Sequence, residues 1–219
     1  MPNRAGEESG FTLVELLFGI LLLSISSIGF YTVLFASADG SKKAEQSSQV
    51  AAEARLGFNR MVRDTREGIE IKNPSNVSYT VEVDFDGDGV IEPNPADPTG
   101  NYERMIFTFN PGLSGSGTIT AGNGTASEVL VRGVDCIRKA DNSCHDVFTY
   151  RSSRLQYDSN GDGVTSAIEL DAAATIGNGN GTLDGAEPGA VNSVAFGIRV
   201  RVGDNVTNFY SEAQLRNER

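Results

Sequence analysis

The sequence predicts an α+β protein in which a long N-terminal helix packs on an antiparallel β-sheet head with long calcium-type loops. Two observations predict the helix: an apolar run at residues 11–38 and an amphipathic stripe in the segment that follows it. A third observation predicts the sheet, because the remainder of the chain alternates between short apolar-patterned segments and stretches rich in Gly, Asn and Asp.

The apolar run is FTLVELLFGILLLSISSIGFYTVLFASA, 28 residues with Glu15 as its one charged side chain. A helix of about 20 apolar residues crosses the hydrocarbon core of a bilayer, so this run is long enough to span a membrane. Burying a carboxylate in the hydrocarbon of a membrane costs roughly several kcal/mol, so a carboxylate found there usually has a functional role. We therefore expect Glu15 to have a specific partner.

The helix is expected to continue beyond the apolar run through the segment from Ser41 to Gly68, which contains no proline. Its apolar positions fall on one helical face: Val50, Ala54, Phe58, Met61, Val62 and Thr65. We interpret Gly68 as the signal that ends the helix. The pattern thus predicts one helix from about Thr12 to Glu67.

The strands predicted after the helix are Ser78–Asp84, Arg104–Asn110, Glu128–Val134, Val147–Tyr157, Ser193–Val202 and Asn208–Leu215. The last two are joined by GDNVT, which predicts a hairpin. A short helical piece is expected at Ile168–Thr175. An antiparallel sheet of four or more strands, packed on the amphipathic half of the helix, is the economical arrangement of these elements.

Composition restricts the function. The chain has 18 Lys and Arg against 29 Asp and Glu, a net charge of −11, which argues against a nucleic-acid partner. The two cysteines, Cys136 and Cys144, have seven residues between them. An even count beside an export segment favours a disulfide and an oxidising compartment outside the cytoplasm. Free thiols or half of a zinc site are the alternatives, although one His is too few to complete a zinc site.

Gly10 stands directly before Phe11-Thr12-Leu13-Val14-Glu15-Leu16-Leu17, and this contiguous motif resembles the leader junction of type IV pilins and type II secretion pseudopilins. The resemblance implies that a prepilin peptidase cleaves between Gly10 and Phe11 and methylates the new N-terminal Phe11. The free amine would then lie one helical turn before Glu15. In a bundle of packed helices the amine of one subunit can meet the Glu15 carboxylate of a neighbour, which would fix the axial register.

The segments RDTREG and YSEAQLRN are similar to those of minor pilins and J-type minor pseudopilins. On this reading residues 1–10 are the leader peptide, 11–38 the transmembrane and filament-core helix, 39–68 its amphipathic half, and 69–219 the β-rich head. The expected partners are other major and minor pilins or pseudopilins, the prepilin peptidase and the inner membrane. The alternative is a membrane-anchored extracytoplasmic binding protein or enzyme, calcium-dependent, with a plain signal anchor.

The segment DSNGDGVTSAIE, residues 158–169, matches the twelve-residue calcium loop of the EF-hand pattern. Its expected ligands are Asp158, Asn160, Asp162, the carbonyl of Val164, Ser166 and Glu169. The glycine at the sixth position permits the sharp turn that this loop requires. Because Val147–Tyr157 is expected to be a strand, we interpret the segment as a Ca²⁺ loop inserted in a sheet protein; an acidic loop without an ion is the alternative.

Two further segments match the calcium pattern incompletely. The second offers Asn178, Asn180, Thr182, Asp184 and Glu187, but its first position is Ile176, whose side chain cannot bind a metal. The third offers Asp84, Asp86, Asp88, Val90 and Glu92, but its twelfth position is Pro95. A hairpin loop without a metal is an open alternative for the third segment.

Catalysis finds no support in the sequence. His145 is the one histidine and is interpreted as a solvated loop residue. No G-x-S-x-G, H-E-x-x-H or phosphate-binding loop is present. The chain is therefore expected not to be an enzyme.

Overall fold

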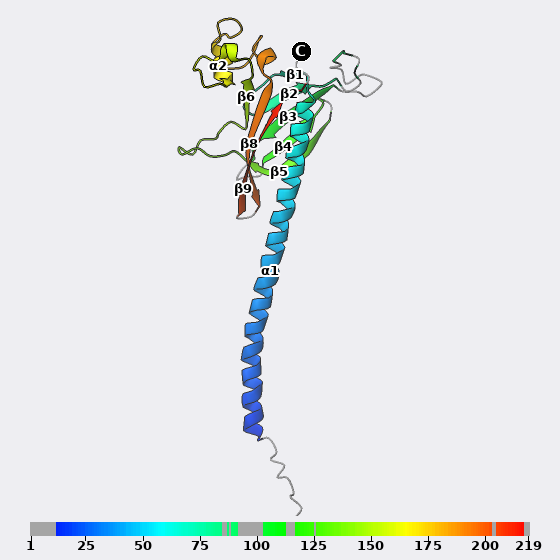
Figure 1. Cartoon of the computed structure of the whole chain (residues 1–219). Coiled ribbons are helices and arrows are strands. Elements are labelled where there is room, and N and C mark those ends of the chain that lie inside the picture. The colour runs from blue at the N-terminus through cyan, green and yellow to red at the C-terminus, as the bar shows by residue number, and fades with distance from the viewer. Residues whose placement is uncertain are drawn as a thin grey trace, which may run out of the picture. The chain divides into compact units, whose positions relative to one another are not determined.

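The computed structural model describes residues 12–84, 87, 89–91, 103–112, 117–124, 126–202 and 205–216. By its internal contacts the chain divides into two compact units, Met1–Gln46 and Ser47–Arg219. The long helix α1, Leu13–Arg66, contributes to both units, and the sheet belongs to the second (Figure 1). The predicted α+β class and the predicted single helix are confirmed.

The second unit contains a curled antiparallel sheet of nine strands. Their bounds are β1 Glu70–Lys72, β2 Ser78–Glu82, β3 Arg104–Asn110, β4 Gly117–Gly122, β5 Ser127–Asp135, β6 Phe148–Ser152, β7 Thr165–Ser166, β8 Ser193–Val202 and β9 Asn205–Gln214. The described residues of this unit also form a short helix α2, Ala167–Ala172, and the 3-10 turns Leu155–Tyr157 and Pro188–Ala190.

The strand order is β1-β2-β3-β4-β5-β8-β6-β7, with β9 paired to β8 outside this path. Strand β9 pairs with β8 along all ten residues, so β5 and β6 lie end to end on the opposite edge of β8. The sheet curls far enough that β1 contacts the 3-10 turn Pro188–Ala190 immediately before β8. Figure 1 shows α2 and its loops beside β6.

The core lies between the second half of α1 and the curled sheet. Phe58 packs against Phe196 and Phe209, with ring centroids 6.4 Å and 5.6 Å away. Gly57 lets the helix approach β5 closely, because an added Cβ would lie 2.5 Å from the carbonyl oxygen of Leu130. Burial of such aromatic and aliphatic surface is the main stabilising contribution to this unit.

Several predicted boundaries were wrong. The predicted strand Val147–Tyr157 ends at Ser152, because Leu155–Tyr157 forms a 3-10 turn that leads into the acidic loop. The final strand begins at Asn205, so most of the expected GDNVT loop is strand. Strands β1, β4 and β7 were not predicted; each is short or rich in glycine and threonine.

Candidate functional site

The N-terminal part of α1 exposes a continuous apolar surface. Large side chains from Leu13 to Phe35 are about half to three-quarters exposed. Among the described residues, α1 is the one helix long and apolar enough to cross a membrane by length and composition, with a mean hydropathy of 2.2 in its most apolar window. None of that window is buried. These properties fit a membrane anchor near the N-terminus.

Glu15 lies in the first turn of α1 and is exposed. Its backbone N–H donates to the hydroxyl oxygen of Thr12 at 3.3 Å, which satisfies one of the free amides at the start of the helix. A carboxylate at this end also interacts favourably with the helix dipole. The predicted processing residues Gly10 and Phe11 lie outside the described residues.

The first acidic loop, residues 158–169, is organised by its side-chain carboxylates and amides. The two carboxylate oxygens of Asp158 accept hydrogen bonds from the N–H groups of Gly161 and Gly163, at 2.7 Å and 2.9 Å. Both glycines have positive φ angles, 74° and 85°, which side chains disfavour. The chain therefore wraps around the Asp158 carboxylate.

Two further side chains continue this turn. The Asn160 amide oxygen accepts from the Asp162 N–H at 2.7 Å, and an Asp162 carboxylate oxygen accepts from the Val164 N–H at 2.8 Å. Such contacts hold polar side chains toward their own backbone. The predicted ligands from Asp158 to Val164 are thus brought into one turn.

Glu169 joins the two ends of the first loop. One carboxylate oxygen accepts from the N–H groups of Ser159 and Asn160, at 3.1 Å and 3.3 Å, and the other accepts from the Ser166 N–H and hydroxyl, both at 2.9 Å. Ser166 and Glu169 together form a capping box that begins α2. The Ser166 backbone and hydroxyl donors lower the pKa of Glu169 to about 2, so its carboxylate is ionised at neutral pH.

The second acidic loop is bound by a carboxylate that lies outside the twelve-residue calcium pattern. Asp171, at the end of α2, accepts from the N–H groups of Asn180 and Gly181, at 3.1 Å and 2.8 Å. Ile176, at the template's first position, lies among the apolar residues packed against the core. Asp171 therefore binds the N–H group of the sixth-position glycine in the second loop, as Asp158 does in the first.

The remaining predicted residues of the second loop also converge. Asp184 accepts from the side-chain amides of Asn178 and Asn180, at 2.6 Å and 2.8 Å, and these bonds lower the pKa of Asp184. The Thr182 hydroxyl donates to Asn180 at 2.7 Å. Glu187 is fully buried and accepts from the N–H groups of Asn178 and Asp184, much as Glu169 accepts from the start and the ninth position of the first loop.

The third loop repeats the beginning of the first. Asp84 accepts from the N–H groups of Gly87 and Gly89, at 2.6 Å and 3.0 Å, and these glycines also have positive φ angles. Val90 is described and exposed. Asp86, Asp88 and Glu92 lie outside the described residues, so their predicted role stays a prediction.

The donor set in these loops consists of carboxylate, amide, hydroxyl and carbonyl oxygens, which hard cations such as Ca²⁺ prefer. Within the part of the chain that the structure describes, no three His, Cys, Asp or Glu side chains converge on a point that could hold a metal ion. Instead, the carboxylates of Asp158 and Glu169 point toward backbone amides. The oxygen donors of the loops fit the ligand preference of calcium.

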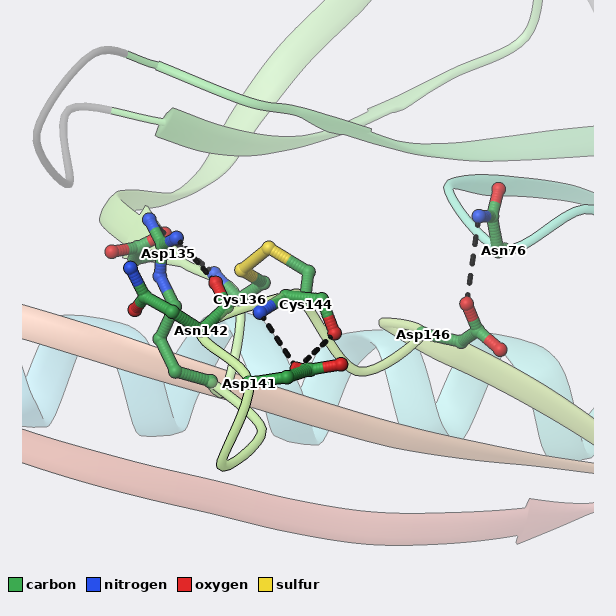
Figure 2. The surroundings of a disulfide bond; sticks show 9 residues. Asn76, Asp135, Cys136, Asp141, Asn142, Cys144 and Asp146 are labelled. Atoms are coloured by element: carbon green, nitrogen blue, oxygen red, sulfur yellow. Dashed lines mark hydrogen bonds and ion pairs between the residues drawn. A yellow bond between two sulfur atoms is a disulfide. The ribbon is translucent and has the colours of Figure 1, made fainter.

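The predicted disulfide between Cys136 and Cys144 is confirmed, with 5.5 Å between the two Cα atoms (Figure 2). Within the ring, Asp141 accepts from the N–H and hydroxyl of Ser143, at 2.9 Å and 2.6 Å. His145, next to Cys144, is exposed and is not placed in any of the three loops. The ring therefore encloses an exposed turn at residues 138–143.

Comparison with protein families finds one match, the prokaryotic N-terminal methylation motif, at residues 7–31. Comparisons with curated proteins and with solved structures give no match. The matched segment includes Gly10, Phe11 and Glu15. The chain thus carries a prokaryotic N-terminal methylation motif, consistent with the type IV pilin and pseudopilin family. In general, this motif implies processing by a prepilin peptidase and assembly with other pilins.

Proposed function

We propose that this protein is a minor pilin or pseudopilin subunit that assembles through its N-terminal helix into a type IV pilus or a type II secretion pseudopilus. The observation that carries the proposal is the methylation motif at residues 7–31, together with the 54-residue helix Leu13–Arg66, which begins within this motif and whose first half is apolar and exposed. A helix of this kind can be held in the inner membrane and later buried among neighbouring helices.

Glu15 is the residue proposed to direct assembly. Its carboxylate is the one acidic group in the apolar run, and cleavage after Gly10 would place a free amine at Phe11, one turn away. In a bundle of such helices, pairing between the amine of one subunit and Glu15 of the next would offset the cost of burying either charge alone. The head would then lie in the periplasm and finally on the filament.

Calcium is proposed to stabilise the head. Asp158, Asn160, Asp162, the Val164 carbonyl, Ser166 and Glu169 would hold the first ion, with Glu169 turning from its backbone amides toward the metal. Asp171, with Asn178, Asn180, Thr182, Asp184 and Glu187, would hold a second. A cation there would link segments on both sides of α2 and neutralise part of the negative charge.

Mass spectrometry of the mature chain from its native membrane tests the proposal. A chain that begins with N-methylated Phe11 is the expected result. An intact Met1, or cleavage near Ala38, would contradict the proposal and favour a plain signal anchor.

A Glu15→Ala variant tests assembly separately from processing. We expect it to insert in the membrane and to be cleaved normally, yet to be depleted at least about tenfold from the filament fraction. A Glu45→Ala variant, which removes another exposed carboxylate of α1 outside the apolar run, is the control and should enter filaments as the wild type does. Normal incorporation of Glu15→Ala would overturn the role given to this carboxylate.

A further inference from the structure

Three strands of the sheet, β1, β7 and β9, each pair with one neighbouring strand, and their outer edges differ. Strand β1 has three residues and carries the Lys72–Glu70 ion pair, and β7 has two residues. Strand β9 has ten residues, and its register with β8 runs without a bulge. Proteins usually shorten, charge or bend exposed edges to prevent pairing with other chains, and β1 and β7 follow this rule. Strand β9 does not.

The hydrogen bonds at its ends show which amides of β9 point outward. The Leu215 N–H donates to Asn192, just before β8, whereas the Arg216 N–H donates to the Arg66 carbonyl of α1. Successive residues of a strand point their N–H groups to opposite edges. The even-numbered residues from Val206 to Glu212 therefore point away from β8. No described residue provides these outward groups with a partner.

The alternation within β8 supports this assignment. The Gly197 N–H donates to the Val147 carbonyl on the β6 side, and Gly197 is aligned with Tyr210. In an antiparallel pair, two aligned residues either both point their backbone N–H and C=O groups toward the other strand or both point them away from it. Because the backbone groups of Gly197 point away from β9, the backbone groups of Tyr210 point away from β8.

The side chains along the outer edge of β9 leave its backbone accessible to another strand. Val206 and Tyr210 are 45% and 69% exposed, four residues apart on one face. Glu212 is the one charged residue from 206 to 214, and it is bound by Arg151 at 3.3 Å and by the Ser193 hydroxyl at 2.6 Å. No lysine or proline protects the strand. Among the described residues, the edge therefore offers unpaired backbone groups beside the exposed side chains of Val206 and Tyr210.

We propose that the outer edge of β9, residues 206–212, pairs with an extended strand from the head of a neighbouring, different subunit of the filament. Main-chain bonds supply affinity in such strand addition, and the side chains of Val206 and Tyr210 select apolar residues at alternate positions. A second copy of this chain is disfavoured as occupant because each copy carries a net charge of −11. The inference rests on the proposed function, since it names a filament neighbour.

Two substitutions at Asn208 test the backbone directly in the full chain, expressed with its sibling subunits. Asn208→Pro removes an outward N–H, and proline is tolerated at a solvent-facing edge position because no bond to β8 is lost. Asn208→Ala removes the side chain and keeps the N–H, so it is the matched control. We expect Asn208→Pro to be depleted at least about tenfold from filaments and Asn208→Ala to be incorporated as the wild type is.

Hydrogen exchange of the wild-type chain gives a second measurement that does not depend on the folding of a variant. The amides of Asn208, Tyr210 and Glu212 should exchange at least about tenfold more slowly in filaments than in detergent-solubilised chain. Equal exchange in both states, or normal incorporation of a folded Asn208→Pro chain, would overturn the proposal.

The remaining outcomes separate the two proposals. Protection that rises with the concentration of the purified chain alone would show pairing between copies and overturn the assignment to a different subunit. Absence of the wild-type chain from filaments would overturn the proposed function and this inference together. Wild-type incorporation with unprotected β9 amides would overturn the inference alone.

Discussion

The carboxylate of Asp171 accepts a hydrogen bond from the backbone N–H of Gly181 at 2.8 Å, across ten residues of chain. In the first acidic loop Asp158 makes the equivalent bond to Gly163, five residues away, at 2.9 Å. The two loops therefore share a carboxylate–amide contact at the glycine in their sixth position, although one takes its carboxylate from within the loop and the other takes it from α2. Asp171 is for this reason included among the ligands proposed for the second loop.

Calcium should raise the melting temperature of the full chain in detergent. An ion that binds only the folded head stabilises it by about 2.7 kcal/mol when its concentration is 100 times the dissociation constant. Asp158→Asn and Asp171→Asn should each lose part of this calcium-dependent shift, because each removes a charged ligand. Thermal melts with calcium and with chelator measure the shift.

Asp146→Asn is the control for these variants, because Asp146 lies outside the loops, where its carboxylate accepts a hydrogen bond from the Asn76 side-chain amide at 3.5 Å (Figure 2). It should retain the full calcium response. If the melting temperature of the wild type does not shift with calcium, the proposal that the head binds calcium is wrong. If Asp171→Asn alone keeps the wild-type shift, Asp171 is not a calcium ligand of the second loop.

Gly57→Ala should destabilise the head. The added Cβ would lie 2.5 Å from the Leu130 carbonyl oxygen and 2.7 Å from a methyl group of Val131, and overpacking of this kind costs roughly 1–3 kcal/mol. The better helix propensity of alanine offsets about 1 kcal/mol of that cost. Chemical denaturation of the full chain measures the difference.

Gly40→Ala provides the matched control, since Gly40 lies in the same helix and a Cβ added there would have no atom within 4 Å. It should leave the denaturation midpoint of the head unchanged. Equal midpoints for Gly57→Ala and the wild type would show that the helix and β5 can separate without loss of stability.

The sequence predicted those parts of the fold in which one buried face makes apolar side chains recur at regular spacing. Strands β3 and β8 match their predicted bounds because apolar side chains alternate along them, as at Phe107 and Phe109. Strand β4 was missed because Gly117 and Gly122 at its ends and the threonines between them weaken that pattern. Asp171 was missed because it precedes the twelve-residue template by five positions and is brought to the loop by the turn after α2.

Removing the disulfide should cost about 2–3 kcal/mol of stability, the loop-entropy value for a ring of this size. Cys136 is buried in the core cluster, so the double variant Cys136→Ser with Cys144→Ser also places a hydroxyl in apolar surroundings. Denaturation of the wild type with and without dithiothreitol isolates the cross-link from this packing effect. Identical midpoints in the two conditions would show that the ring does not restrain the unfolded chain.

Asp141 should titrate below the ordinary aspartate pKa of 3.8. The hydroxyl and the backbone N–H of Ser143 both donate to its carboxylate and lower its pKa. Because the folded pKa is the lower one, the stabilisation of this turn is fully present above about pH 3.8 and is lost as the pH falls through the folded value. In the variant Ser143→Ala the hydroxyl donor is absent and the backbone donor remains, so the pKa of Asp141 should move toward 3.8 without reaching it. Carbon-detected NMR titration of the Asp141 carboxyl measures both midpoints, and identical midpoints in the two chains would contradict the role assigned to the hydroxyl.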